Sequence, residues 1–101
     1  MHLVQLLIPL TRNDGSPQPA DRFAELRAEL VDRFGGVTAF SRAPAEGLWD
    51  DGAAIDRDRL ILVEVMAPEL DRGWWANYRR TLEARFEQEE LMIRAVATER
   101  L

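Results

Sequence analysis

The sequence predicts a single α+β domain in which strands and helices follow the order β-α-β-β-α-β. Three observations predict it: two stretches with apolar residues three or four apart, four short aliphatic runs, and turn-forming residues between them. A length of 101 residues is also the common size of one domain and leaves no room for a second core. We therefore expect one domain over residues 1–101.

The first half of the chain is expected to contain one strand and one helix. The apolar run at residues 2–9 predicts the strand, and the segment 11–17, dense in turn formers, predicts the loop after it. Ser16 is the expected cap of the helix. Apolar residues then recur at steps of three or four up to Phe34, where Gly35 and its neighbour should end the helix, because glycine adopts the left-handed conformation without a Cβ clash.

The second half is expected to add two strands, a helix and a last strand. A strand begins at Val37, and the segment 41–49 is interpreted as extended, because its proline and glycine argue against a regular central strand. The aliphatic run at residues 59–67 is the clearest strand of the chain. A second helix is predicted to begin near Leu70, and the last strand to cover residues 91–98.

Strand alternation divides the predicted sheet into two faces, because residues two apart point the same way. One face is expected to lie under both helices, and we call it the helical face. It comprises Val4, Leu6, Ile8, Val37, Ala39, Ile61, Val63, Val65, Ile93, Ala95 and Ala97. This element order and these faces predict a ferredoxin-like sandwich, with a four-stranded antiparallel sheet and two helices on one face.

The opposite face of the sheet, the non-helical face, is too apolar to be left in water. Its apolar members are expected to be Leu3, Leu7, Phe40, Leu60, Leu62, Met66, Met92 and Val96. An exposed apolar patch of this kind usually marks a partner surface. Sheet-to-sheet packing of two copies is the simplest cover, so the sequence predicts a homodimer.

Four polar side chains, Gln5, Arg42, Glu64 and Arg94, are predicted to interrupt this face. They allow two interpretations. An arginine and a glutamate could form a structural ion pair under a dimer interface. Alternatively, Arg42 or Arg94 would bind the carboxylate or phosphate of a small anionic ligand, with Glu64 orienting it or acting as a general base. Trp49, close to the predicted hairpin, is the candidate for the mouth of such a ligand pocket.

Charge and composition exclude several classes of function. With 18 acidic and 13 basic residues the formal charge is −5, which disfavours a nucleic-acid partner, and the strand at residues 59–67 offers no aromatic side chain for stacking bases. The absence of cysteine excludes disulfides, thiolate metal sites and a cysteine nucleophile. We expect no metal and no cofactor. No apolar stretch approaches the roughly 20 residues that span a bilayer, so we expect a cytoplasmic protein without a membrane partner.

Two resemblances accompany these inferences. The element order and the apolar second face resemble the dimeric α/β-barrel superfamily, whose protomers pack sheet faces and often leave a ligand cavity. The string from Phe34 to Arg42, together with that from Pro44 to Trp49, is similar to a family of small uncharacterised bacterial proteins.

The function expected is binding or interaction through the non-helical face of a homodimer. The superfamily resemblance implies an alternative, a small cofactor-free enzyme of the monooxygenase or isomerase type that acts on a small organic acid through Arg42, Glu64 and Arg94. A regulatory domain that senses an amino acid is a third class that the sequence leaves open.

Overall fold

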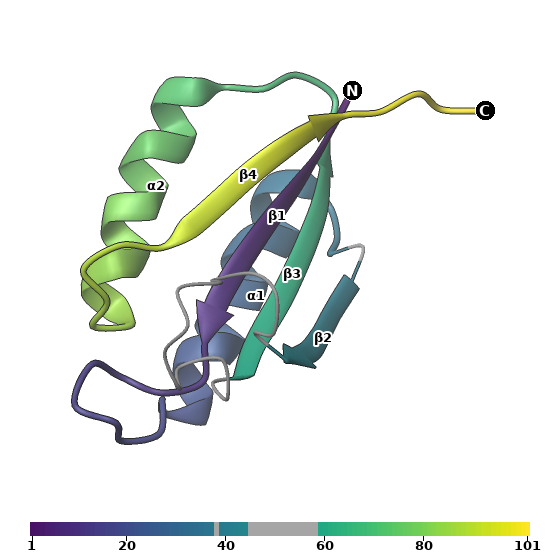
Figure 1. Cartoon of the computed structure of the whole chain (residues 1–101). Helices are drawn as coiled ribbons and strands as arrows, with labels where there is room; N and C mark the ends of the chain where they lie inside the picture. The colour runs from purple at the N-terminus through teal and green to yellow at the C-terminus, as the bar shows by residue number, and fades with distance from the viewer. Residues whose placement is uncertain (38, 45–58) are drawn as a thin grey trace, which may run out of the picture.

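The structure, a computed structural model, describes residues 1–37, 39–44 and 59–101. Its elements in chain order are β1 (His2–Pro9), α1 (Ala20–Phe34), β2 (Ala39–Pro44), β3 (Arg59–Ala67), α2 (Arg72–Arg85) and β4 (Met92–Ala97). Figure 1 shows the strands side by side in one sheet, with α1 behind it. The predicted α+β class is confirmed. Within the described ranges, no helix is both long and apolar enough to cross a membrane.

The strands are arranged in the order β2-β3-β1-β4, and every neighbouring pair is antiparallel. The two aliphatic strands β1 and β3 occupy the middle of the sheet and pair along the whole of β1, from His2 opposite Ala67 to Pro9 opposite Leu60. These largely aliphatic strands suit the central positions, because their alternate residues are buried in the core against the helices. The outer strands are β2 and β4.

Both helices cover the same face of the sheet. Val4, Leu6 and Ile8 alternate along β1 and are at most 1% exposed. The main hydrophobic cluster joins them to further buried residues of β3, of both helices and of the C-cap of α2, among them Val63, Val65, Leu26, Leu30, Trp75, Leu82 and Phe86. Removing each such large side chain from water contributes about 1.5–3 kcal/mol, so this layer is the main source of stability.

The start of α1 differs from the expectation, while its end agrees with it. Ser16 does not cap the helix: its backbone N–H and its hydroxyl both donate to Oδ1 of Asp14, at 2.9 and 2.6 Å. The helix instead begins after Pro19, because proline disfavours a helical conformation in the residue that precedes it. Gly35 ends the helix as predicted, with a φ of 81° and its N–H bonded to the carbonyl of Val31.

The second helix begins at Arg72, two residues later than expected. Asp71 caps it, and its carboxylate accepts a hydrogen bond of 3.0 Å from the backbone N–H of Trp74. The carboxylate thereby supplies an acceptor for one of the N–H groups that the first turn of a helix leaves unpaired. The predicted apolar stripe is confirmed, since Trp75 and Leu82 are buried against the core.

The outer strand β4 is less covered than the sequence predicted. Ala95 and Ala97, expected on the helical face, are both exposed, and Ile93 alone within the strand is half-buried. The reason is position: β4 is an outer strand, and the helical cover of this face reaches Ile93 but not the two alanines. Alternation identifies the face of a residue, but it does not say how far the helices extend over that face.

Candidate functional site

A row of three polar side chains crosses the non-helical face, and we call it the polar row. It consists of Glu64 on β3, Gln5 on β1 and Arg94 on β4, which stand opposite one another in the strand register. The side-chain amide of Gln5 donates to Oε2 of Glu64 at 2.7 Å, and its oxygen accepts from Nε of Arg94 at 2.7 Å. The structure therefore brings together three of the four polar residues predicted on this face.

The polar row has a negative charge at one end, a neutral amide in the middle and a positive charge at the other end. The Gln5 amide directs its oxygen to the cation and its nitrogen to the anion, so each charged group meets the matching end of the amide dipole. Gln5 and Glu64 are half-buried, whereas Arg94 is exposed. Arg94 binds Gln5 through Nε, and its two terminal amino groups make no hydrogen bond with the described residues. These amino groups can receive a carboxylate or phosphate in a two-point interaction.

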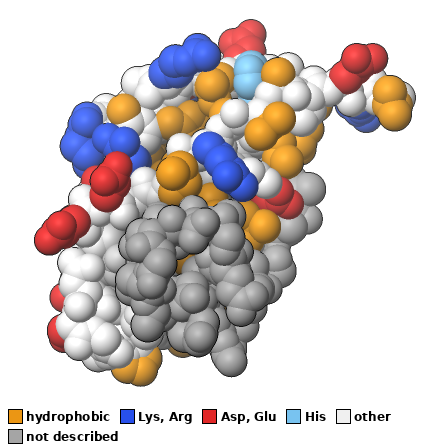
Figure 2. Space-filling view, in the orientation of Figure 1, with side chains coloured by type: hydrophobic (Ala, Val, Ile, Leu, Met, Phe, Trp, Pro, Cys, Tyr) orange, Lys and Arg blue, Asp and Glu red, His pale blue; other side chains and the backbone are white. Residues whose placement is uncertain are grey.

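Apolar side chains flank the polar row on both sides. Met66, Leu3 and Val96 form the register row toward the N-terminal end of β1. Among the large apolar side chains of this face, Val96 and Met92 are 49% and 46% exposed. Figure 2 shows this face, where charged side chains are set among hydrophobic ones. The site is thus a charged strip with an apolar border.

Side chains at the other end of the non-helical face are already buried. Leu7 and Leu60 are buried and form a second, smaller hydrophobic cluster, against which Leu62 packs. The surface open to a partner is therefore concentrated on β4 and the N-terminal half of β1.

The strand register does not set Arg42 in line with the polar row, contrary to the expectation. The register of β2 on β3 places Arg42 opposite Ile61, a residue of the helical face, and places Ala39 opposite Glu64. Directly opposite residues share a face, so a shift of one residue exchanges the faces of the whole strand. Periodicity within so short an outer strand does not determine that register. Trp49, the predicted residue of a pocket mouth, lies outside the described residues.

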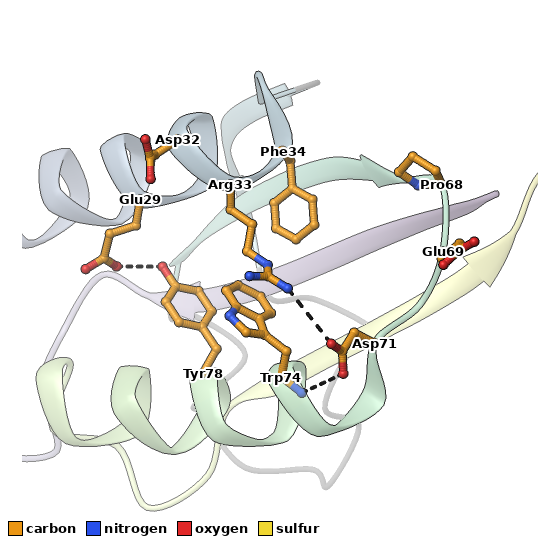
Figure 3. A pocket seen from close by; sticks show the side chains of 9 residues that line it. All are labelled: Glu29, Asp32, Arg33, Phe34, Pro68, Glu69, Asp71, Trp74 and Tyr78. Atoms are coloured by element: carbon orange, nitrogen blue, oxygen red, sulfur yellow. Dashed lines mark hydrogen bonds and ion pairs between the residues drawn. The ribbon is translucent and has the colours of Figure 1, made fainter.

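A hollow that the sequence did not predict is a groove of about 890 Å³ between the end of α1 and the start of α2. Figure 3 shows Arg33 of α1 extending toward Trp74 of α2, and Glu29 of α1 facing Tyr78 of α2. Its lining residues are Glu29, Asp32, Arg33, Phe34, Pro68, Glu69, Asp71, Trp74 and Tyr78.

At one end of this groove, the positive charge of Arg33 is already paired with groups of the chain itself. The guanidinium of Arg33 lies over the ring of Trp74, 4.2 Å from its centroid, and 3.9 Å from a carboxylate oxygen of Asp71. Trp74 in turn stacks on Tyr78, with ring centroids 4.8 Å apart. A cation from the chain itself therefore already occupies the aromatic surface that would attract a cationic ligand.

The other end of the groove is a link between the helices. Glu29 accepts hydrogen bonds from the hydroxyl of Tyr78 at 2.7 Å and from two nitrogens of Arg85 at 2.7 and 2.9 Å. The bonds from Arg85 hold the pKa of the Glu29 carboxyl below its ordinary value, against the opposing effect of burial. Burial, together with the bond to Glu29, raises the pKa of Tyr78. No sequence pattern signals this cluster, because Glu29 and Arg85 lie on different helices.

The polar row is thus the better candidate for a binding site, because its exposed end still has hydrogen-bond donors to offer. Comparisons of the chain with protein-family models, with curated proteins and with solved structures find no match.

Proposed function

We propose that this protein is a homodimeric binding domain with a ferredoxin-like fold, which interacts through its non-helical face. The fold proposal is supported by the β2-β3-β1-β4 strand order and by the placement of both helices on one face. The single observation that carries the functional proposal is the polar row, which ends in an exposed arginine between exposed apolar side chains.

The chemistry of this surface indicates the kind of group it would bind. Apolar side chains such as Met92 and Val96 gain about 25 cal/mol for each Å² that a partner removes from water. Arg94 adds direction, because Gln5 holds its Nε and turns it toward the sheet. A partner with an apolar surface and one anionic group satisfies both features.

A small organic acid as a substrate is the alternative, and the free amino groups of Arg94 favour it. Glu64 lies two strands away, about 10 Å across the sheet, and only one of its oxygens accepts from Gln5. An acid held by Arg94 would then extend along the row toward a carboxylate that could accept a proton. This alternative is the function that the resemblance to dimeric α/β-barrel proteins implies.

Two measurements test the proposal. Light scattering of the purified chain over a wide range of concentrations should give the mass of a dimer, and a monomer at every concentration would contradict the homodimer. Thermal unfolding with inorganic phosphate and with a panel of small carboxylic acids should then reveal a ligand. A ligand at one hundred times its Kd stabilises a protein by about 2.7 kcal/mol.

A matched pair of variants locates the ligand. Arg94→Met should remove the ligand-dependent stabilisation while leaving the protein folded, because Arg94 is exposed. Arg27→Met is the control, since Arg27 is an exposed arginine of α1 and lies away from the polar row. Equal stabilisation of the wild type and Arg94→Met would rule out the polar row as the site.

A further inference from the structure

We infer that two copies of the chain join along the free edge of β4, where each β4 pairs with the other in the antiparallel sense about a two-fold axis at Ala95. This inference rests on the proposed homodimer and specifies where its two copies meet. It replaces sheet-to-sheet packing with one continuous sheet, formed from the two four-stranded sheets.

The exposure of β4 on both faces favours an edge contact. Met92, Arg94 and Val96 are exposed on the non-helical face, and Ala95 and Ala97 are exposed on the helical face. A copy stacked on the non-helical face would cover only the first three. A copy that approaches along the edge lies next to both sets, and the small alanines leave room for it beside the helices.

The outward backbone groups of β4 can be identified from one hydrogen bond. The N–H of Thr98 donates to the carbonyl of Met1 at 3.0 Å, in the same register in which Ala97 pairs with His2. Backbone groups alternate in direction along an antiparallel strand. The N–H and C=O groups of Ile93, Ala95 and Ala97 therefore point away from β1.

The outer edge of β4 lacks the devices that normally protect such a strand. Unpaired outward groups form a template for another strand, and proteins usually block it with proline, lysine or a bulge. The sequence Met92–Ala97 contains neither proline nor lysine. Its one charged residue, Arg94, is bonded through its side chain to Gln5 on the adjacent β1, away from the edge.

Charge excludes one register of the pair. In a continuous sheet, residues of one face must stand opposite residues of the same face, so the axis passes through a residue that stands opposite itself. An axis at Arg94 would set two guanidinium-bearing residues opposite each other with Cα atoms about 4.5 Å apart, which is destabilising. An axis at Ala95 sets alanine against alanine instead.

This register also satisfies every outward group. Ala95 pairs with the partner's Ala95, and Ile93 pairs with the partner's Ala97 in both directions, which forms about six backbone hydrogen bonds. Arg94 stands opposite the partner's Val96, where its aliphatic stem can cover that exposed side chain. The two Arg94 residues take diagonal positions about 7–8 Å apart, so both polar rows open on the same face beside the seam.

The first test uses opposite charges at the axis. Ala95→Glu and Ala95→Lys each place like charges opposite one another in their own dimers, whereas a mixed dimer places glutamate opposite lysine. Ala95 is exposed, so both variants should fold. Native mass spectrometry of an equal mixture should show a mixed dimer well above the half of all dimers that random exchange produces.

The matched control uses the same substitutions at Ala97. In the proposed register Ala97 stands opposite the partner's Ile93 rather than opposite itself, so Ala97→Glu mixed with Ala97→Lys should give close to the random half. A second variant, Ala95→Pro, removes an outward N–H without breaking a bond to β1 and should weaken the dimer more than tenfold, while circular dichroism shows the fold retained.

The outcomes separate this inference from the proposal on which it rests. A wild-type monomer at every concentration would contradict both the homodimer and the seam. A wild-type dimer whose Ala95 charge variants mix at random, or whose Ala95→Pro variant associates as tightly as the wild type, would leave the homodimer standing and place its interface elsewhere.

Discussion

Arg85 of α2 donates two hydrogen bonds, of 2.7 and 2.9 Å, to the carboxylate of Glu29 on α1, and this pair joins the two helices. The arginine side chain is 13% exposed and the glutamate side chain 39%. Helices that lie on one face of a sheet can slide relative to each other, and a two-point interaction with fixed geometry opposes such movement.

Replacing Arg85 with methionine should therefore destabilise the protein. We expect a decrease of about 1.5–3 kcal/mol in the free energy of unfolding, the usual size for hydrogen bonds to a charged group. Urea denaturation measures it, with Arg27→Met as the control, because an exposed surface change should stay within about 0.5 kcal/mol. Arg85→Met also removes the ion pair of 2.8 Å between Nε of Arg85 and Glu25 of α1, so equal midpoints for the two variants would show that the contacts of Arg85 with α1 contribute nothing to stability.

The same pair predicts a dependence of stability on pH. The pKa of Glu29 is lowered in the folded state, mainly by its hydrogen bonds from Arg85. A lowered carboxyl pKa contributes stability above the pKa of the unfolded chain, and this contribution is lost as the pH falls through the folded value. Glu29→Gln should thus lower the melting temperature near neutral pH.

The difference between Glu29→Gln and the wild type should shrink as the pH falls through the lowered pKa of Glu29 in the folded protein, because the wild-type carboxyl then loses its charge. Thermal unfolding of both proteins over a pH series measures this difference. A gap that stays constant over the whole acidic range would mean that the charge of Glu29 is not what stabilises the link.

We expect the largest loss of stability from a single substitution in the central strand β1. Leu6 of β1 is fully buried among residues of both helices, so Leu6→Ala should cost about 2–5 kcal/mol through lost burial and the cavity left behind. Val31→Ala on α1, where the side chain is 42% exposed, is the control and should have little effect. Chemical denaturation compares the two, and a similar loss in both would contradict the assignment of the core.

We expect the stability losses from substituting two glutamines, Gln18 and Gln88, to be non-additive. The side-chain amides of Gln18 and Gln88 both donate to the carbonyls of Thr11 and Phe86, at distances between 2.7 and 3.2 Å. Either amide alone can still serve both carbonyls. Gln18→Ala and Gln88→Ala should each cost roughly 1 kcal/mol, and the double variant clearly more than their sum, because it leaves both carbonyls without these donors.

A double-mutant cycle measured by denaturation tests this coupling between Gln18 and Gln88. Strict additivity would show that the two amides act independently.

Much of the fold could be predicted from local sequence signals. The strands β1 and β3 were predicted with the bounds that the structure has, because dense aliphatic runs between turn formers leave little choice. The end of α1 at Gly35 and the burial of Trp75 also followed from local chemistry, namely a left-handed cap and a helical apolar stripe.

The candidate site was only partly predictable. Alternation placed Gln5, Glu64 and Arg94 on one face, but the strand order decides that Gln5 lies between the two charges and binds both. The same order makes β4 an outer strand, which leaves Ala95 exposed. Arg42 was expected in line with Glu64, but the register of β2, which depends on its pairing with β3, sets Arg42 opposite Ile61.

The sequence by itself therefore determined the elements, the apolar layer between sheet and helices, and the polar residues available to the open face. The tertiary structure decided which of those polar residues touch, which strand has a free edge, and how Glu29 meets Arg85. The physical reason is range: caps, turns and periodicity act within a few residues, whereas register, strand order and contacts between helices arise from segments brought together only when the chain folds.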